Sequence, residues 1–155
     1  MHHRWTKGEF EISTDPTLID LPAVHDYLTN SYWAKGIPVE TVQRSIANSL
    51  CFGIYQEGRQ VGFARVVSDQ ATFAYLADVL VLEPYRGRGL SKWLMECILS
   101  HPDLQGLRRW MLDTRDAHAL YQQYGFTHLK APERWMEIHS PDIYAKKLRS
   151  PVPSE

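Results

Sequence analysis

The chain has 155 residues, a length typical of one domain with a hydrophobic core of its own. Apolar residues make up 44% of it, charged residues 23%, and the formal net charge is −1. This near-neutral composition excludes a strongly basic nucleic-acid-binding protein, and no stretch is long and apolar enough to predict a membrane span. We therefore expect a single domain over residues 1–145, a loose tail over residues 146–155, and neither nucleic acid nor membrane as a partner.

Hydrophobic periodicity predicts one strand and two helices in the first third of the chain. Glu9–Ser13 alternates apolar and polar residues, as a short strand does. One helix is expected from about residue 19 to 31, and a second from Val39 to Asn48. The loop between them is aromatic and contains Tyr32 and Trp33.

Three strands are expected next. Leu50–Gln56 and Gln60–Val67 flank Glu57–Arg59, a strong hairpin signal. Phe73–Leu82 follows after a turn and is apolar on both faces, which predicts a central strand covered on both sides.

The second half of the chain predicts a helix from Leu90 to about Ser100, a strand over Arg109–Asp113 and a short helix from about Asp116 to Tyr124. Phe126–Leu129 and Trp135–His139 are expected to close the domain as strands. The predicted order is β-α-α-β-β-β-α-β-α-β-β. This order indicates a mixed α/β (α+β) fold with a central, mostly antiparallel sheet flanked by helices.

The most informative stretch joins the apolar strand ending at Leu82 to the helix beginning at Leu90. It is Arg86-Gly87-Arg88-Gly89-Leu90-Ser91, which we call the glycine turn. Two glycines allow a tight turn and close approach of the backbone to a ligand. The first amides of the following helix have no intrahelical acceptors, and the helix dipole adds partial positive charge there. The glycine turn therefore predicts a phosphate-binding site.

Two familiar phosphate-binding motifs do not match this stretch. A P-loop requires Gly-x-x-x-x-Gly-Lys-Ser/Thr, and the sequence has no such string. A dinucleotide-binding fingerprint requires a third glycine where Lys92 stands, and it normally follows the first strand of a parallel unit. Asp113 lies near the spacing expected of its ribose-binding carboxylate, but the preceding antiparallel strands argue against that fold.

A third motif fits better. The glycine turn resembles the Arg/Gln-x-x-Gly-x-Gly/Ala motif of the GNAT acetyltransferases, and it stands at the same place between strand and helix. A second match follows at residues 117–126, where Ala-His-Ala-Leu-Tyr-Gln-Gln-Tyr-Gly-Phe is similar to the family's Ala-x-x-x-Tyr-x-x-x-Gly-Phe segment. Both matches occur in the family's order, and the resemblance covers about Leu50 to Leu129.

The resemblance implies an N-acetyltransferase that moves an acetyl group from acetyl-CoA to a primary amine of a small molecule or peptide by direct attack. No metal is implied. The backbone of the glycine turn would bind the pyrophosphate of CoA, and backbone groups of Leu80 and Val81 would align the pantetheine and thioester. The implied cofactor-binding residues are Leu80, Val81, Arg86, Gly87, Arg88, Gly89, Leu90, Ser91 and Thr114.

Two residues are implied for the chemistry. Tyr121 occupies the tyrosine position of the second match, where it would protonate the departing CoA sulfur. The alternative for Tyr121 is a core tyrosine, and Tyr124 is the substitute acid. Asp78 lies in an apolar strand, where an unpaired carboxylate is costly, so it is either the general base or a buried, hydrogen-bonded structural group. Glu83, Asp113 and a water chain remain alternatives for the base.

Other features leave alternatives open. Thr114 would contact pantetheine or cap the next helix. Tyr32 and Trp33 would line the acceptor site or pack in the core. Exposed aromatic residues near the ends leave a homodimer open. Cys51 and Cys97 lack metal or redox spacing, which predicts buried free thiols and a cytoplasmic location.

Two other functions compete with catalysis. The same fold with lost catalysis would be a non-catalytic acyl-CoA-binding sensor. A dinucleotide-binding enzyme would use the same turn for a different phosphate ligand. Binding of acetyl-CoA, CoA and NAD, followed by an amine panel, distinguishes these alternatives.

Overall fold

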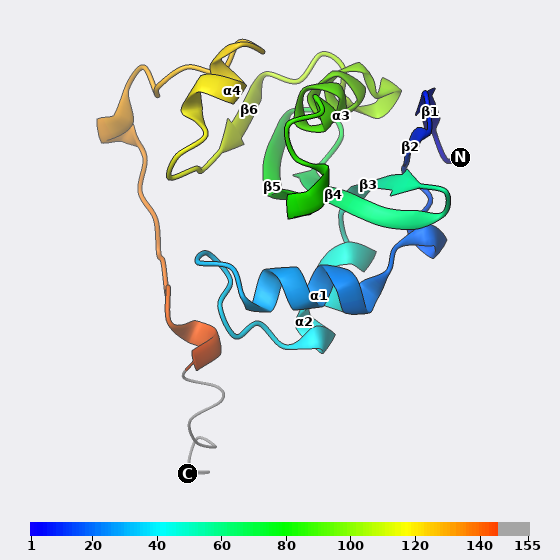
Figure 1. The fold of residues 1–155 in the computed structure, drawn as a ribbon. Coiled ribbons are helices and arrows are strands. Elements are labelled where there is room, and N and C mark those ends of the chain that lie inside the picture. The colour runs from blue at the N-terminus through cyan, green and yellow to red at the C-terminus, as the bar shows by residue number, and fades with distance from the viewer. Residues whose placement is uncertain (146–155) are drawn as a thin grey trace. The chain divides into compact units, whose positions relative to one another are not determined.

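The computed structural model describes residues 1–145 (Figure 1). The chain divides into two compact units, each made of two stretches. Met1–Ile19 and Ile46–Thr127 form the first, the sheet unit, and Asp20–Ser45 with the residues from His128 onward form the second, the helical unit. The expected loose tail, residues 146–155, lies outside the described residues.

The sheet unit contains one six-stranded sheet whose spatial order follows the chain. Its strands are β1 (Arg4–Lys7), β2 (Phe10–Ser13), β3 (Leu50–Gln56), β4 (Arg59–Ser68), β5 (Phe73–Val81) and β6 (Arg109–Leu112). Neighbouring strands from β1 to β5 pair antiparallel, and β6 pairs parallel to β5. The predicted mixed α/β fold with a mostly antiparallel sheet is therefore confirmed.

Local turn chemistry explains two of the hairpins. Glu57 and Gly58 connect β3 to β4 with φ angles of +49° and +81°, as a two-residue type I′ turn requires. Gly8, with φ +60°, begins the two-residue turn from β1 to β2. The strand β1 was not expected from the sequence, because Trp5 is its only large apolar residue and Arg4–Lys7 shows no alternation to mark it.

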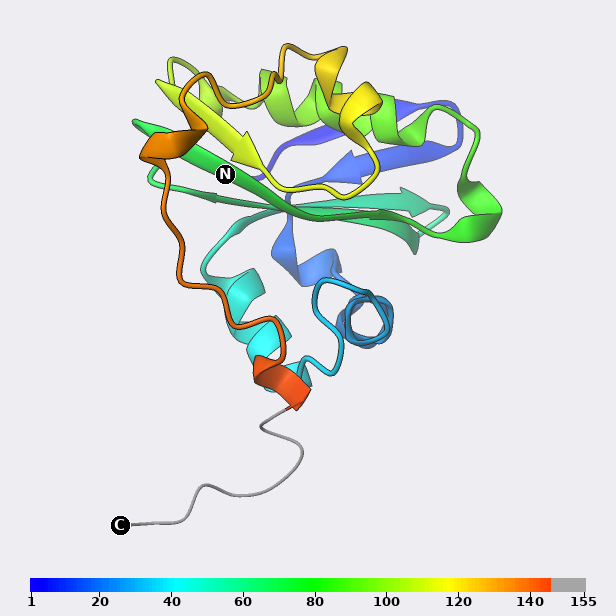
Figure 2. The ribbon, with the colours of Figure 1, turned by 90° about the vertical axis from the view of Figure 1, so that its left-hand side faces the viewer.

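Two helices of the sheet unit pack on one side of the sheet, as Figure 2 shows. These are α3 (Leu90–Ser100), which follows β5 through the 3₁₀ turn Glu83–Tyr85, and the short α4 (His118–Gln122), which follows β6. Their apolar faces and that of the sheet form a single cluster. Its fully buried large members are Ile12, Phe52, Ile54, Val61, Val66, Leu94, Met95 and Ile98.

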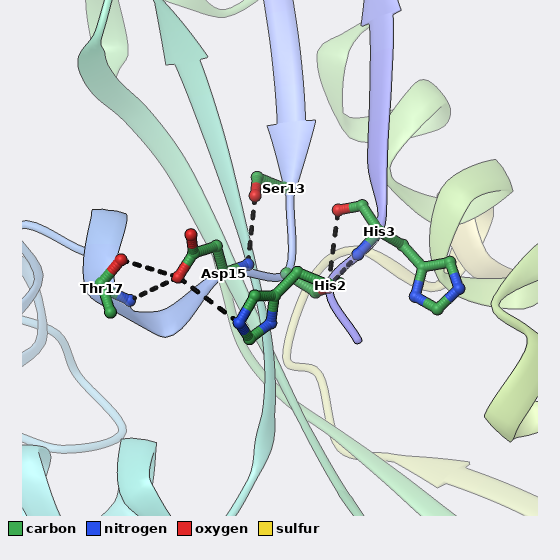
Figure 3. A network of polar contacts seen from close by, with 6 residues as sticks. His2, His3, Ser13, Asp15 and Thr17 are labelled. Carbon is green, nitrogen blue, oxygen red and sulfur yellow. Dashed lines mark hydrogen bonds and ion pairs between the residues drawn. The ribbon is translucent and has the colours of Figure 1, made fainter.

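The N-terminal residues are tied to the segment after β2 by a polar network (Figure 3). The His3 amide donates to Thr14 Oγ1 at 2.8 Å, and the Thr14 amide donates to the His3 carbonyl at 3.0 Å. Asp15 Oδ1 accepts from the Thr17 amide and hydroxyl and lies 3.9 Å from His2 Nε2. These bonds fix the edge strand β1 in register.

The helical unit contains α1 (Leu21–Thr29) and most of α2 (Val39–Ala47), with a loop between them. Asp20 caps α1, because its carboxylate accepts from the Ala23 amide at 3.1 Å. In the described part of the chain, no helix is long and apolar enough to cross a membrane.

The two predicted closing strands are wrong. Phe126–Leu129 and Trp135–His139 form no strand in the described part of the chain, and Pro132–Arg134 forms a 3₁₀ turn instead. Met136 and Ile138 are 96% and 102% exposed, so the alternation buries no face. Alternation predicts a strand only where another strand supplies backbone partners, and among residues 1–145 β6 pairs with β5 alone.

Candidate functional site

The strands β5 and β6 pair along only part of β5. Their register runs from Phe73 opposite Arg109 to Leu76 opposite Leu112, where β6 ends. Residues 77–81 of β5 therefore extend beyond the end of β6. The Leu82 amide donates to the Val61 carbonyl on the β4 side at 2.9 Å. Backbone N–H and C=O groups alternate in direction along a strand. The N–H and C=O groups of Val81 therefore point away from β4, toward the side of β5 on which β6 has already ended.

The backbone of β5 also bulges where it parts from β6. Phe63 lies opposite Leu80 and Arg65 opposite Ala77, so β5 has one residue more than β4 over this interval. Asp78 lies within the bulge at φ +54°, a left-handed conformation that costs a residue with a side chain about 1 to 2 kcal/mol.

Asp78 is held in an ion pair across the sheet. Its Oδ2 accepts from Arg65 Nε at 2.8 Å, and the two side chains are 11% and 19% exposed. Arg65 Nη1 also donates to Ser49 Oγ at 3.2 Å. The sequence left two interpretations of Asp78 open, a general base and a buried, hydrogen-bonded structural group. The ion pair agrees with the second.

The glycine turn has the backbone conformation that its sequence predicts. Gly87 and Gly89 have φ angles of +79° and +78°, and Gly89 is the N-cap of α3. The Trp93 amide donates to the Gly89 carbonyl at 3.1 Å, while the amides before it in this first turn have no intrahelical acceptor. A Cβ added at either glycine would meet nothing within 4 Å. The turn is therefore exposed and open, and it fits a phosphate ligand bound by main-chain amides.

The arginine side chains of this turn are engaged locally. Arg86 Nε donates to the Val81 carbonyl at 2.9 Å, which ties the glycine turn to the end of β5. The Arg88 guanidinium lies 5.6 Å from the centre of the Tyr85 ring. These two side chains therefore connect the glycine turn to the end of β5 and to the 3₁₀ turn that follows β5.

The second motif lies beside the first. Tyr121 is buried in the same apolar cluster as Val81 and Leu90, and its ring meets that of Phe126 edge to face with centroids 6.0 Å apart. The Tyr124 hydroxyl donates to the Lys92 carbonyl in the first turn of α3 at 3.1 Å. The structure therefore brings the Tyr121 segment and the glycine turn together.

The sequence predicted three further residues for the site, Thr114, Tyr32 and Trp33. Thr114 Oγ1 accepts from the Ala117 amide at 3.1 Å and from the Asp116 amide at 3.4 Å, so it stabilises the turn before α4. Tyr32 and Trp33 belong to the helical unit, where both are exposed and their rings meet edge to face with centroids 5.1 Å apart.

The sequence did not identify Arg65, Ser49 and Tyr75 as polar groups in the surroundings of Asp78. The only available signal was indirect: a carboxylate in an apolar strand requires a partner, and Arg65 lies in the neighbouring predicted strand. Burial raises the pKa of Tyr75, and the carboxylates of Asp113 and Asp78 raise it further. Tyr75 therefore stays protonated at neutral pH.

Both cysteines are free and buried. Burial raises the pKa of Cys51 and of Cys97 to about 12 in each case. Neither thiol is therefore an activated nucleophile. Among residues 1–145, no group of three or more His, Cys, Asp or Glu side chains could hold a metal ion.

This α/β fold thus has a bulged strand that extends beyond its neighbour, followed by a glycine turn at a helix N-terminus, an arrangement that fits a phosphate-bearing ligand. The model of the acetyltransferase (GNAT) family matches residues 21–126. The chain belongs to the GNAT acetyltransferase family.

Individual relatives agree with this assignment. A proposed acetyltransferase of Gibberella zeae is 32% identical over 140 residues, which cover 76% of this chain and 78% of that protein. The crystal structure of a proposed GNAT acetyltransferase from Xanthomonas campestris is 54% identical. Its TM-score is 0.87, with 88% of this chain and 96% of that one covered.

A more distant structure has the same fold with a ligand. It is a GNAT acetyltransferase from Elizabethkingia anophelis with acetyl-CoA bound, with a TM-score of 0.55 and 15% identity. The match covers 82% of this chain and 75% of that one, and at this identity it supports the fold alone.

Proposed function

We propose that the protein is an N-acetyltransferase that moves the acetyl group of acetyl-CoA to a primary amine of a small molecule or peptide. The observation that carries this proposal is the glycine turn, with Gly87 and Gly89 in left-handed conformations at the N-terminus of α3. It directly follows the part of β5 that has no β6 partner. Membership in the acetyltransferase family supports the same reaction.

In this proposal the main chain binds the donor. The amides of Arg86–Ser91 donate to the pyrophosphate, and the outward backbone groups of Val81 bond to the pantetheine arm. Leu80 contributes by packing, since its backbone groups turn toward β4. Membership in the acetyltransferase family supports this choice of donor.

The amine nitrogen attacks the thioester carbonyl, a C–N bond forms, and the C–S bond breaks. Tyr121 donates its phenolic proton to the departing thiolate, because a phenol of ordinary pKa near 10 remains protonated at neutral pH. The proton lost by the amine passes to solvent. Asp78 is the weaker alternative as base, because its Oδ2 already accepts a hydrogen bond from Arg65 Nε at 2.8 Å.

The acceptor side is proposed from the exposed aromatic pair of the helical unit. Tyr32 and Trp33 suit an apolar or aromatic amine, or a cation held over a ring face. The free cysteines suit a reducing compartment, and we propose that the protein acts in the cytoplasm.

A ligand screen tests the proposed donor. Acetyl-CoA and CoA should raise the melting temperature of the protein, and NAD should not. A panel of amines is then assayed for release of the CoA thiol, with acetylated product identified by mass spectrometry. A shift by NAD alone would indicate a dinucleotide enzyme. Binding of acetyl-CoA without turnover of any amine class would indicate a sensor and refute the proposed catalysis.

A further inference from the structure

The bulge in β5 lies shortly before Val81 and the glycine turn, the residues that the proposed function gives to acetyl-CoA binding. Its residue Asp78 has a left-handed backbone at φ +54° and lies in the part of β5, residues 77–81, that extends beyond the end of β6. Few residues other than glycine adopt this conformation; aspartate does so more often than most, and it still needs support from its surroundings. The support must come from what Asp78 touches.

Arg65 supplies that support from the adjacent strand. Its Nε donates to Asp78 Oδ2 at 2.8 Å, and its Nη1 donates to Ser49 Oγ at 3.2 Å. The guanidinium thus connects three segments: the residues before β3, the strand β4 and the bulge of β5. With 19% and 11% of their side chains exposed, the partners are shielded enough for a strong charge-assisted bond.

The backbone conformation at residue 78 determines the direction of the backbone groups that follow it in β5. Val81 follows it by three positions, and the Val81 carbonyl accepts from Arg86 Nε at 2.9 Å, so the glycine turn is attached to the same strand end. A change of backbone conformation at residue 78 would therefore move both the outward backbone groups of Val81 and the attachment of the glycine turn.

We propose that Arg65 and Asp78 form an ionic clamp that holds the β5 bulge, and that Arg65 is a positioning residue for the acetyl-CoA site. This inference rests on the proposed function for its ligand. It assigns Asp78 a backbone role instead of the role of general base. The two roles make opposite predictions for a glycine at position 78.

The test compares two double variants, R65M/D78G and R65M/D78A. Both remove the carboxylate, and Met replaces Arg so that no unpaired charge stays buried. Glycine adopts φ +54° without strain, whereas alanine does not. R65M/D78G should bind acetyl-CoA within about threefold of wild type, and R65M/D78A about tenfold more weakly, as a left-handed penalty of this size implies. R59M, an exposed arginine on the same strand, is the matched control.

Turnover distinguishes a clamp from a base. A positioning role predicts that glycine in R65M/D78G restores most of the kcat that R65M/D78A loses, with the pH profile of wild type. If folded R65M/D78G and R65M/D78A lose turnover equally while both bind acetyl-CoA like R59M, Asp78 is the base and the clamp is refuted. If R65M/D78A does not fold, R65M/D78G alone decides: retained binding and turnover support the clamp, and their loss overturns it.

A ligand-free measurement separates this inference from the proposed function. Amide resonances of Val81 and Leu82 in ¹⁵N-correlated NMR spectra should stay near their wild-type positions in R65M/D78G and move in R65M/D78A. Should wild type bind no acetyl-CoA, the proposed function fails, and these spectra still test the clamp. Equal displacement in both variants would refute it.

Discussion

The Tyr124 hydroxyl donates a hydrogen bond to the Lys92 carbonyl at 3.1 Å, which connects the residues after α4 to the first turn of α3. Burial, with a smaller contribution from Glu96, raises the pKa of Tyr124, so this donor keeps its proton at neutral pH. Tyr121, one turn earlier, is buried in the core. Two tyrosines of one short segment thus have different surroundings, and they should respond differently to the same substitution.

Tyr124→Phe should lower the free energy of unfolding by about 0.5 to 1.5 kcal/mol, because one hydrogen bond between two elements is lost. Turnover should change less than about threefold, since transition-state stabilisation is untouched. Urea unfolding and the thiol-release assay measure the two effects. A large loss of kcat with unchanged stability would instead make Tyr124 the proton donor.

Tyr121→Phe keeps the buried ring and removes only the hydroxyl. We expect kcat to fall by about a hundredfold or more, as for loss of a general acid, with the affinity for acetyl-CoA unchanged. Calorimetric titration of acetyl-CoA serves as the control for folding and donor binding. Wild-type kcat in this variant would show that Tyr121 is a core residue only.

Gly89→Val should weaken acetyl-CoA binding by more than about tenfold, because a β-branched residue does not tolerate φ +78° at this N-cap. Arg88→Ala should weaken it only about two- to fivefold, as for loss of one exposed charge near a helix N-terminus. Calorimetry on both variants checks this ranking. Equal losses would show that the arginine side chain matters as much as the backbone.

His101 should make the protein less stable in acid. It is 1% exposed, its Nδ1 accepts from the Asp103 amide at 3.1 Å, and its ring lies 4.5 Å from that of His3. Burial, followed by the charge of His3, lowers the pKa of His101 from its ordinary 6.5. The unfolded chain therefore takes up a proton below about pH 6.5 while the folded chain does not, so unfolding becomes easier as pH falls through that region.

Chemical denaturation between pH 7.5 and 5 measures this effect. The slope attributable to one histidine should reach at most about 1.4 kcal/mol per pH unit. His101→Gln should be less stable than wild type at pH 7.5, but its stability should depend less on pH. An unchanged slope in His101→Gln would contradict the assignment.

Cys51 and Cys97 should not react with a thiol reagent in the folded protein, because burial raises the pKa of each thiol to about 12. Native protein at pH 8 should release no thionitrobenzoate from Ellman's reagent within minutes, and protein in guanidinium should release two equivalents per chain, one for each cysteine. Rapid reaction of the native protein would show that one thiol is accessible.

Local chemistry explains what the sequence by itself determined. Gly87 and Gly89 allow left-handed turns, and the apolar stripe of α3 favours a helix directly after them, so the conformation of the glycine turn follows from neighbouring residues. The Glu57–Gly58 hairpin is local in the same sense. These features predicted the mixed sheet and the family motif without knowledge of any distant contact.

Only the tertiary structure decided the rest, because it depends on pairs far apart in the chain. Arg65 and Asp78 meet through the register of β4 and β5, which a strand pattern does not specify. The alternation of Trp135–His139 suggested a strand, yet a strand needs backbone partners, and periodicity says nothing about whether an edge supplies them. The sequence determined the glycine turn, and long-range pairing determined the bulge that precedes it.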